Sequence, residues 1–551
     1  MGYFFLWLET MALAWFLVAV VFSFTGRLKK WPVVWPILMA VIITVPAVLL
    51  SILSGKIFFL HIHPQWLFPY NLSWTLIFLA GTWLLIRQGQ RPSREAPAAA
   101  SWSRSKCTGA LLILLALQWS TINSLDNTSM VKATAAQTMA LTRTQAIFPS
   151  PPAKDEDAVE IYNQAEEEMG KLPGWLWEAA KDPAFDTRSD KTQTLLQDKH
   201  KAIALLKEGS RKSRLYHPLT LTFDSEIPRY APFRNGVNLL ALEARNFARK
   251  GQMAAALANI SDMENIAEQI NQTPTLISTM VASAIHSNSK NTLEIILAES
   301  PGHSKIKVNL PVKTHDQILQ GLQKSLVIED AMQDFGMADI LINHPSMYLF
   351  SYAFDESFWG GFENKLYRVF LYPDDLASHG DYFKKVYEFT KQPYYQSGSE
   401  FKEWENHLAE NIELGIMSSI ALPSIFRYFD KTTYHQTEFL LGRLGLASAA
   451  YRSDHGKYPA TLNALVPKYI REIPKDPFSG EPLKMLAVDG GLILYGVGED
   501  LKDDGGLAYD DINKTGDPAF YLGSAFKEHR LKPAIEKQRQ QEAKRTNKRK
   551  K

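Results

Sequence analysis

Apolar residues are concentrated at the start of the chain, in four stretches that are nearly free of charged side chains. These stretches cover residues 4–24, 33–53, 70–86 and 108–122. A helix needs about 20 apolar residues to cross the hydrocarbon layer of a bilayer, and each stretch is near this length. The pattern therefore predicts an α-helical membrane anchor with four spans over residues 1–125.

The loops between these stretches differ in their basic residues. Eight Lys or Arg side chains lie in the first and third loops, whereas the second loop holds only Lys56. Short cytoplasmic loops accumulate Lys and Arg, so this bias predicts an N-terminus outside the cytoplasm. We expect a protein of the bacterial inner (cytoplasmic) membrane whose large C-terminal body, after about Ser124, lies in the periplasm.

Helical periodicity dominates the chain beyond the four stretches. A Ser-, Thr-, Ala- and Pro-rich segment at 126–152 is predicted to be a linker, and 153–433 a largely α-helical exported domain. Apolar residues recur at three- and four-residue spacing over 237–248 and 253–270, and Pro274 opens another helix. Because the turns between these helices are short, we expect them to pack as antiparallel neighbours.

Aromatic side chains are dense between residues 335 and 432. Their large apolar area favours a packed core between helices. The alternative is an aromatic groove that binds a glycan or a peptide.

A helix followed by short strands is predicted for residues 434–523. The helix ends before Gly456, which suits a left-handed cap, and Pro459 prevents its continuation. A short helix with Leu462 and Leu465 follows, and residues 483–488 and 492–497 are predicted to be two strands of a hairpin around the turn Asp489-Gly490-Gly491. The region is therefore predicted to be a small α+β module that ends in a long acidic loop.

The last segment, 524–551, is strongly basic. Residues 527–551 hold eleven Lys or Arg against three Glu. A block of like charge is usually disordered and binds polyanions, so we expect a basic disordered tail that contacts anionic lipid or polymer. No nucleic-acid partner is expected if the predicted topology is correct.

Composition narrows the chemistry further. The 551 residues carry 60 basic and 58 acidic side chains, and the hydrophobic fraction of 46% excludes a disordered chain. The single cysteine, Cys107, excludes an intramolecular disulfide framework and any multi-cysteine metal site. The chain has no G-x-S-x-G, H-E-x-x-H, phosphate-loop or dinucleotide motif, so no nucleophile, catalytic metal or cofactor is indicated.

The predicted module resembles the globular domain of major type II secretion pseudopilins. The resemblance covers residues 434–523 and rests on three segments in order, "YRSDHGKYPATLNALVPKYI", "DPFSGEPL" and "LILYGVGEDLKDDGG". A pseudopilin has one N-terminal apolar helix with a Glu at the fifth mature position. Here Glu9 is the seventh residue after Gly2, and three more apolar stretches intervene, so we do not expect this chain to polymerise as a pilin. More loosely, the whole chain resembles bacterial multi-span membrane-anchored proteins.

In calcium-binding pseudopilins the loop after the hairpin holds the ion, and the matching loop here is rich in aspartate. Calcium takes six to eight oxygen ligands, several of them carboxylates, and glycines allow a loop to wrap around it. Aspartate and glycine are also ordinary turn residues, which is the alternative. The resemblance implies calcium as the cofactor, with these candidate ligands: Asp500, Asp503, Asp504, Asp510 and Asp511.

Taken together, these patterns favour a non-enzymatic bacterial envelope membrane protein. It would act as a scaffold or as a partner-recognition component, associated with secretion or pilus-type machinery, and would contact the lipid bilayer and envelope proteins. The first alternative is an exported hydrolase with a site in the aromatic helical region. The second is a small transporter or channel subunit.

Overall fold

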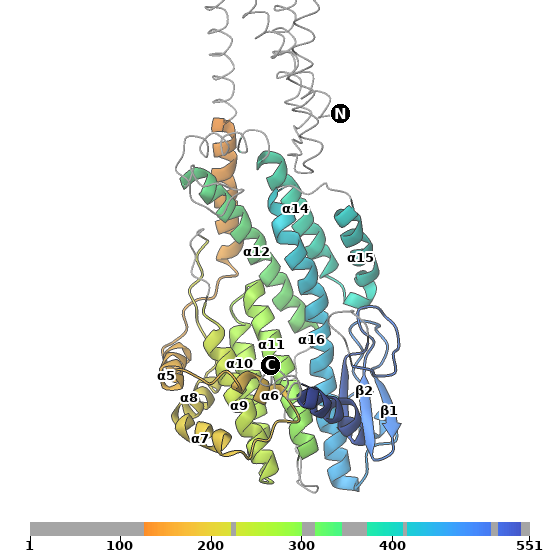
Figure 1. Cartoon of the computed structure of the whole chain (residues 1–551). Coiled ribbons are helices and arrows are strands. Elements are labelled where there is room, and N and C mark those ends of the chain that lie inside the picture. The colour runs from red at the N-terminus through yellow and green to blue at the C-terminus, as the bar shows by residue number, and fades with distance from the viewer. Residues whose placement is uncertain are drawn as a thin grey trace, which may run out of the picture. The chain divides into compact units, whose positions relative to one another are not determined.

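A computed structural model describes residues 126–221, 228–299, 315–343, 368, 372–410, 416–508 and 516–540. The chain divides into two units. The first holds Met1–Thr138 and Met337–His379, and the second holds Met139–Gly336 and Gly380–Lys551. The described part is mostly helical and contains one small antiparallel sheet, which lies in the second unit (Figure 1).

The predicted membrane anchor has to be corrected. Every helix in the described part of the chain is either too short or too polar to cross a lipid bilayer. Even the longest, α16 (Ile416–His455), carries Asp430, Lys431, Glu438 and Arg443 along its length. The four apolar stretches themselves lie outside the described residues. The four-span fold, the membrane assignment and the predicted placement in the inner membrane with a periplasmic body are therefore not carried forward.

The structure describes only short segments of the first unit. Arg368 connects these segments. Arg368 Nε lies 2.7 Å from Asp126 Oδ1, and its Nη1 donates to the carbonyl oxygen of Leu341 at 3.1 Å. Both the arginine and the aspartate are nearly buried. Through the ion pair and this hydrogen bond, Arg368 joins the start of a helix over residues 126–145 to the end of α12 (His315–Asn343).

The segment 126–152, which we predicted to be a linker, is helical from 126 to 145. In the second unit Ala140 of this helix is buried against Leu221 and Ala331. Small side chains allow two helices to approach closely, so alanines that suggested a flexible segment instead form a packed face.

The helical body of the second unit begins with four short helices. Longer helices follow, of which α12 and α14 extend into both units. The bounds are α5 (Val159–Met169), α6 (Leu176–Lys181), α7 (Asp190–Asp198), α8 (His200–Ser210), α9 (Ala231–Arg249), α10 (Met253–Ile270), α11 (Leu276–Glu299), α14 (Tyr372–Phe389) and α15 (Tyr394–Glu410).

The three helices predicted from apolar periodicity are confirmed as α9, α10 and α11. They pack in sequence against one another, and α16 packs against α11 (Figure 1). Gly251 turns the chain between α9 and α10. Its φ of +75° is a left-handed conformation that glycine adopts without strain. The core between them is apolar and closed, with Leu240, Met263, Ile266 and Leu293 at most 1% exposed.

The described aromatic residues between 380 and 432 form a packed core. The ring of Phe401 lies 4.9 Å from that of Phe429 and 5.3 Å from that of Phe389, and Tyr394 lies 5.1 Å from Phe429. Together they fill the space between α14, α15 and α16. Residues 344–367, which hold much of the predicted aromatic region, lie outside the described residues.

The C-terminal module contains the predicted hairpin and one further strand. The sheet has the order β1 (Lys484–Val488), β2 (Gly491–Tyr495) and β3 (Ala519–Gly523), antiparallel throughout. The helix α16 ends at His455, and Gly456 has φ +74°, which confirms the predicted cap. The predicted short helix is a 3₁₀ turn, η3 (Leu462–Leu465).

The two faces of the sheet are covered by different parts of the second unit. On one face Leu494 and Phe520 are buried against α16, where Gly445 allows close contact because a Cβ there would lie 2.3 Å from the Phe520 ring. On the other face Ile493 and Tyr521 are buried with Ile295 of α11. The loop between β2 and β3 also lies over this second face, since a Cβ on Gly506 would lie 2.6 Å from Ile493.

The segment predicted to be a basic disordered tail is helical over its first part. It comprises α17 (Ser524–Phe526), a π turn (Lys527–Leu531) and a helix over residues 532–540. His529 stacks on Tyr521 at 5.0 Å, and Arg530 Nε lies 3.2 Å from the buried carboxylate of Glu294. The contacts of single basic residues with the body therefore order this segment, although its net charge suggests disorder.

Candidate cation site in the C-terminal module

The acidic loop is held at both ends by the sheet. It leaves β2 after Tyr495 and returns at Ala519 to pair with the same strand. Three glycines have positive φ, Gly505 at +70°, Gly506 at +78° and Gly516 at +93°. A Cβ on Gly516 would lie 2.7 Å from the carbonyl oxygen of Ala508, so the fold requires glycine there. The glycines therefore let two distant parts of the loop meet.

Two aspartates, one on each of these parts of the loop, accept hydrogen bonds from the backbone of the other part. Asp504 Oδ2 accepts a hydrogen bond from the N–H of Gly516 at 3.0 Å, and Asp517 Oδ2 accepts one from the N–H of Gly506 at 2.7 Å. The N–H of Asp517 donates to the carbonyl oxygen of Leu507 at 2.7 Å. Both carboxylates thus face the same small region of backbone.

Asp517 is the most unusual carboxylate of the loop. The residue is 0% exposed, and its second oxygen, Oδ1, has no hydrogen-bond partner in the described part of the chain. Burial raises its pKa to about 6, the Gly506 hydrogen bond opposes this, and the negative charges of Asp504 and Asp503 raise it further. A buried ionised carboxylate with a free oxygen is unfavourable unless a cation compensates it.

The aspartates named from the sequence have different surroundings. Asp503 is exposed; its Oδ2 pairs with Lys484 Nζ at 2.5 Å, and this hydrogen bond lowers its pKa. Asp500 Oδ1 accepts a hydrogen bond from the N–H of Lys502 at 3.2 Å, while its Oδ2 is buried and has no hydrogen-bond partner in the part of the chain that the structure describes. Asp510 and Asp511 lie outside the described residues.

Sequence reasoning therefore named Asp504 but missed Asp517, its closest counterpart. We ended the acidic loop at Asp511, and Asp517 stands directly before the apolar segment that forms β3. The signal that could have found it is the Gly516-Asp517-Pro518 turn, because a carboxylate between a glycine and a buried strand cannot reach solvent easily.

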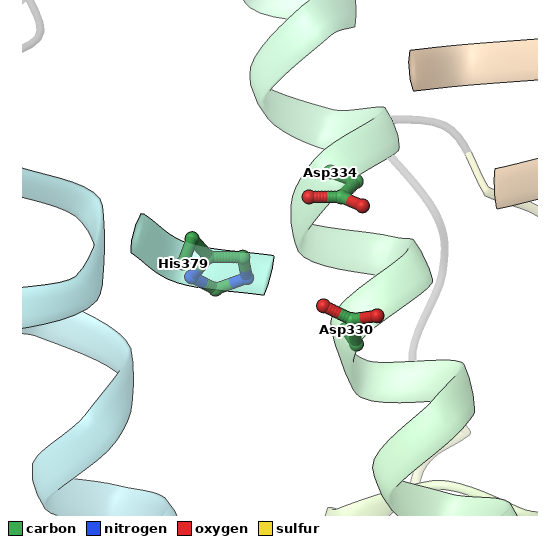
Figure 2. A group of neighbouring side chains, drawn as sticks. All are labelled: Asp330, Asp334 and His379. Carbon is green, nitrogen blue, oxygen red and sulfur yellow. The ribbon is translucent and has the colours of Figure 1, made fainter. Parts of the chain in front are cut away.

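A second acidic pair lies on α12, within the second unit. Figure 2 shows Asp330 and Asp334 on successive turns of this helix. Arg143 Nη1 and Nη2 each lie 2.5 Å from one of the two carboxylates. Burial raises the pKa of both, the neighbouring negative charge of Asp334 adds to the rise at Asp330, and Arg143 opposes it. His379, also labelled in Figure 2, belongs to the first unit, so we assign no site that combines it with Asp330 and Asp334.

A serine, a histidine and a glutamate meet between α11 and α16. Ser287 Oγ lies 2.7 Å from His435 Nδ1, and Glu438 Oε2 lies 3.2 Å from the same nitrogen while also accepting a hydrogen bond from Ser287. In a proton relay the acid and the serine bond to opposite nitrogens of the imidazole. These three side chains instead share one nitrogen, so their geometry fits a structural contact between helices.

Comparisons with known proteins give no assignment. No family model, no curated protein and no solved structure matches the chain. The resemblance of residues 434–523 to pseudopilins thus stays a prediction, and no match supports a link with type II secretion.

Proposed function

We propose that this chain is a non-enzymatic partner-recognition protein whose C-terminal module is ordered by calcium. The observation that carries the proposal is the buried carboxylate of Asp517, whose Oδ1 has no hydrogen-bond partner among the described residues and whose neighbour across the loop is Asp504. A divalent cation at this point would remove the repulsion between the two carboxylates and would satisfy the free oxygen. Calcium suits the loop because it accepts both carboxylate and backbone carbonyl oxygens in a flexible geometry.

The surface around the loop supports recognition of a partner. Leu501 and Leu507, which flank the acidic turn, are 53% and 57% exposed, and Leu486 on β1 is 45% exposed. Leu501 also has φ +57°, an unfavourable conformation for a leucine that does not fill the core. In addition β1 is an edge strand of the described sheet, where it pairs with β2 on one side, and such an edge can accept another strand.

The ordering of the loop would link the cation to this surface. Fixing one residue costs about 1–2 kcal/mol of conformational entropy, so a loop of this length is ordered only with compensating contacts. A ligand that binds the folded state alone stabilises it by roughly 2.7 kcal/mol at a hundredfold excess over its dissociation constant. Calcium binding would thereby hold Leu501 and Leu507 in one arrangement for a partner.

The proposal is tested by melting the full-length chain with calcium and with a chelator. We expect the melting temperature to rise with calcium in the natural chain and in Asp489→Asn, which removes an exposed aspartate of the β1–β2 turn. Asp504→Asn combined with Asp517→Asn should remove the rise. An equal rise in the double variant would show that calcium acts elsewhere, and no rise in the natural chain would refute the calcium part of the proposal.

A further inference from the structure

The second unit contains an open cavity of about 740 Å³ that is separate from the acidic loop. Its walls come from the segment after α6, the ends of α9, α11 and α16, the β1–β2 turn, and the helical segment that follows β3. Small-molecule sites in proteins typically measure about 300–1,000 Å³ and are concave. The size and the number of contributing segments therefore suit a small ligand better than a protein surface.

One wall of this cavity is apolar. Leu522 and Phe526 are buried, at 1% and 3% exposure, and Leu531 and Ile535 are half-buried one turn apart on the C-terminal helical segment. These four side chains give a continuous apolar run from the end of the sheet along the helix. Such a run favours a hydrocarbon group, because burying apolar surface contributes about 25 cal/mol per Å².

The charged side chains of the cavity are mostly basic. Four cations line it against two carboxylates, Asp186 and Glu299. Arg249 pairs with both carboxylates, at 2.9 Å and 2.6 Å. Asp186 also pairs with Arg188 at 3.0 Å, and Glu299 also pairs with the buried Arg245 at 2.9 Å, so neither carboxylate is left without a cation.

Two of the cations have no carboxylate partner among the described residues. Arg452 donates to the Tyr458 hydroxyl at 2.8 Å. Neither Arg452 nor Lys527 forms an ion pair with any residue that the structure describes. Both are exposed, so they stand at the rim, where the positive charge is not compensated.

We infer that this cavity binds an amphiphilic carboxylate. The carboxylate would pair with Arg452 and Lys527 at the rim, and the hydrocarbon chain would lie along Leu522, Phe526, Leu531 and Ile535. A cationic amphiphile would meet uncompensated positive charge, and a small polar anion would leave the apolar wall exposed to water. The site lies apart from the acidic loop and does not depend on calcium.

The inference is tested by titrating decanoate, below its micelle concentration, into the full-length chain in a chelator and following the heat of binding. Arg452→Gln combined with Lys527→Gln should weaken decanoate binding about tenfold, or by about 1.4 kcal/mol, because the two substitutions remove two exposed ion pairs with the carboxylate. The matched control, Arg471→Gln combined with Lys201→Gln, removes two exposed cations outside the cavity and should leave the affinity unchanged.

A photoreactive fatty carboxylate locates the site independently of affinity. We expect it to label the peptide that contains residues 522–535, and excess decanoate should prevent the labelling. Acetate and decyltrimethylammonium should not compete. The inference is overturned if label is found only outside the cavity, if the cationic amphiphile competes as well as decanoate, or if the double variant binds decanoate like its control.

Discussion

Replacement of Asp517 by asparagine isolates the charge that the loop buries. Asparagine has nearly the same shape, and its side-chain oxygen can still accept the hydrogen bond that the N–H of Gly506 donates to the carboxylate. The substitution therefore removes the negative charge while the turn keeps its main contact. In a chelator, without calcium, we expect Asp517→Asn to stabilise the module.

The size of the effect follows from the pKa of Asp517. Burial, assisted by the charges of Asp504 and Asp503, raises it from 3.8 to about 6. The folded state thus binds this proton more tightly than the unfolded state does. Stability is greatest below about pH 4, declines as the pH rises towards about 6, and is lower by about 2–3 kcal/mol above that range. Asp517→Asn should recover this amount near neutral pH.

Hydrogen exchange of the β2 and β3 amides measures this locally, because it reports the opening free energy of the strands themselves. Compared at each pH, Asp517→Asn should match the natural chain near pH 4 and should show slower exchange above about pH 6. Asp489→Asn should match the natural chain throughout. If Asp517→Asn exchanges equally fast or faster at neutral pH, the carboxylate is not an unfavourable buried charge and the reasoning about the site fails.

Three further substitutions test the contacts that build the second unit, each by chemical denaturation. Arg143→Gln leaves the two carboxylates of α12 without their cation and should destabilise the fold by about 2 kcal/mol near pH 7, and by less near pH 4, where the carboxyls are protonated. Burial would raise the pKa of Glu438, but His435 and Lys290 hold it at about 2, so Glu438→Gln should cost about 2–3 kcal/mol above pH 4.5, with a smaller difference as the pH falls towards 2. Gly445→Ala should destabilise by about 2 kcal/mol through a clash with the β3 ring, whereas Gly442→Ala, one turn earlier on α16, meets only ordinary contacts and should stabilise slightly.

The sequence predicted the parts of the fold that local patterns determine. The spacing of Leu240, Met263 and Ile266 predicts α9 and α10 because apolar residues three and four apart line one face of a helix, although both helices also bury polar side chains. The hairpin was predicted from two apolar segments on either side of the turn Asp489-Gly490-Gly491, with bounds within two residues of β1 and β2. The third strand was missed because Ala519–Leu522 is a short apolar segment whose place in the sheet depends on pairing with β2 across the long acidic loop.

Tertiary contacts explain what the sequence could not show. The sequence predicted this helix only within residues 434–523, yet α16 begins at Ile416, and Tyr428 and Phe429 on its first half pack into the aromatic core. The candidate cation site was predicted only in part, because it too depends on tertiary contacts. Asp504 was named from composition, whereas the burial of Asp517 depends on how β3 returns beside β2.

Direct calcium binding is the measurement that tests the central claim. Isothermal titration of calcium into the chelator-treated full-length chain should give saturable binding, with heat that disappears in Asp517→Asn and persists in Asp489→Asn. The same titration with magnesium should give weaker binding, since magnesium requires a stricter octahedral geometry than a flexible loop provides. Calcium binding that is absent in the natural chain, or that is unchanged in Asp517→Asn, would contradict the account.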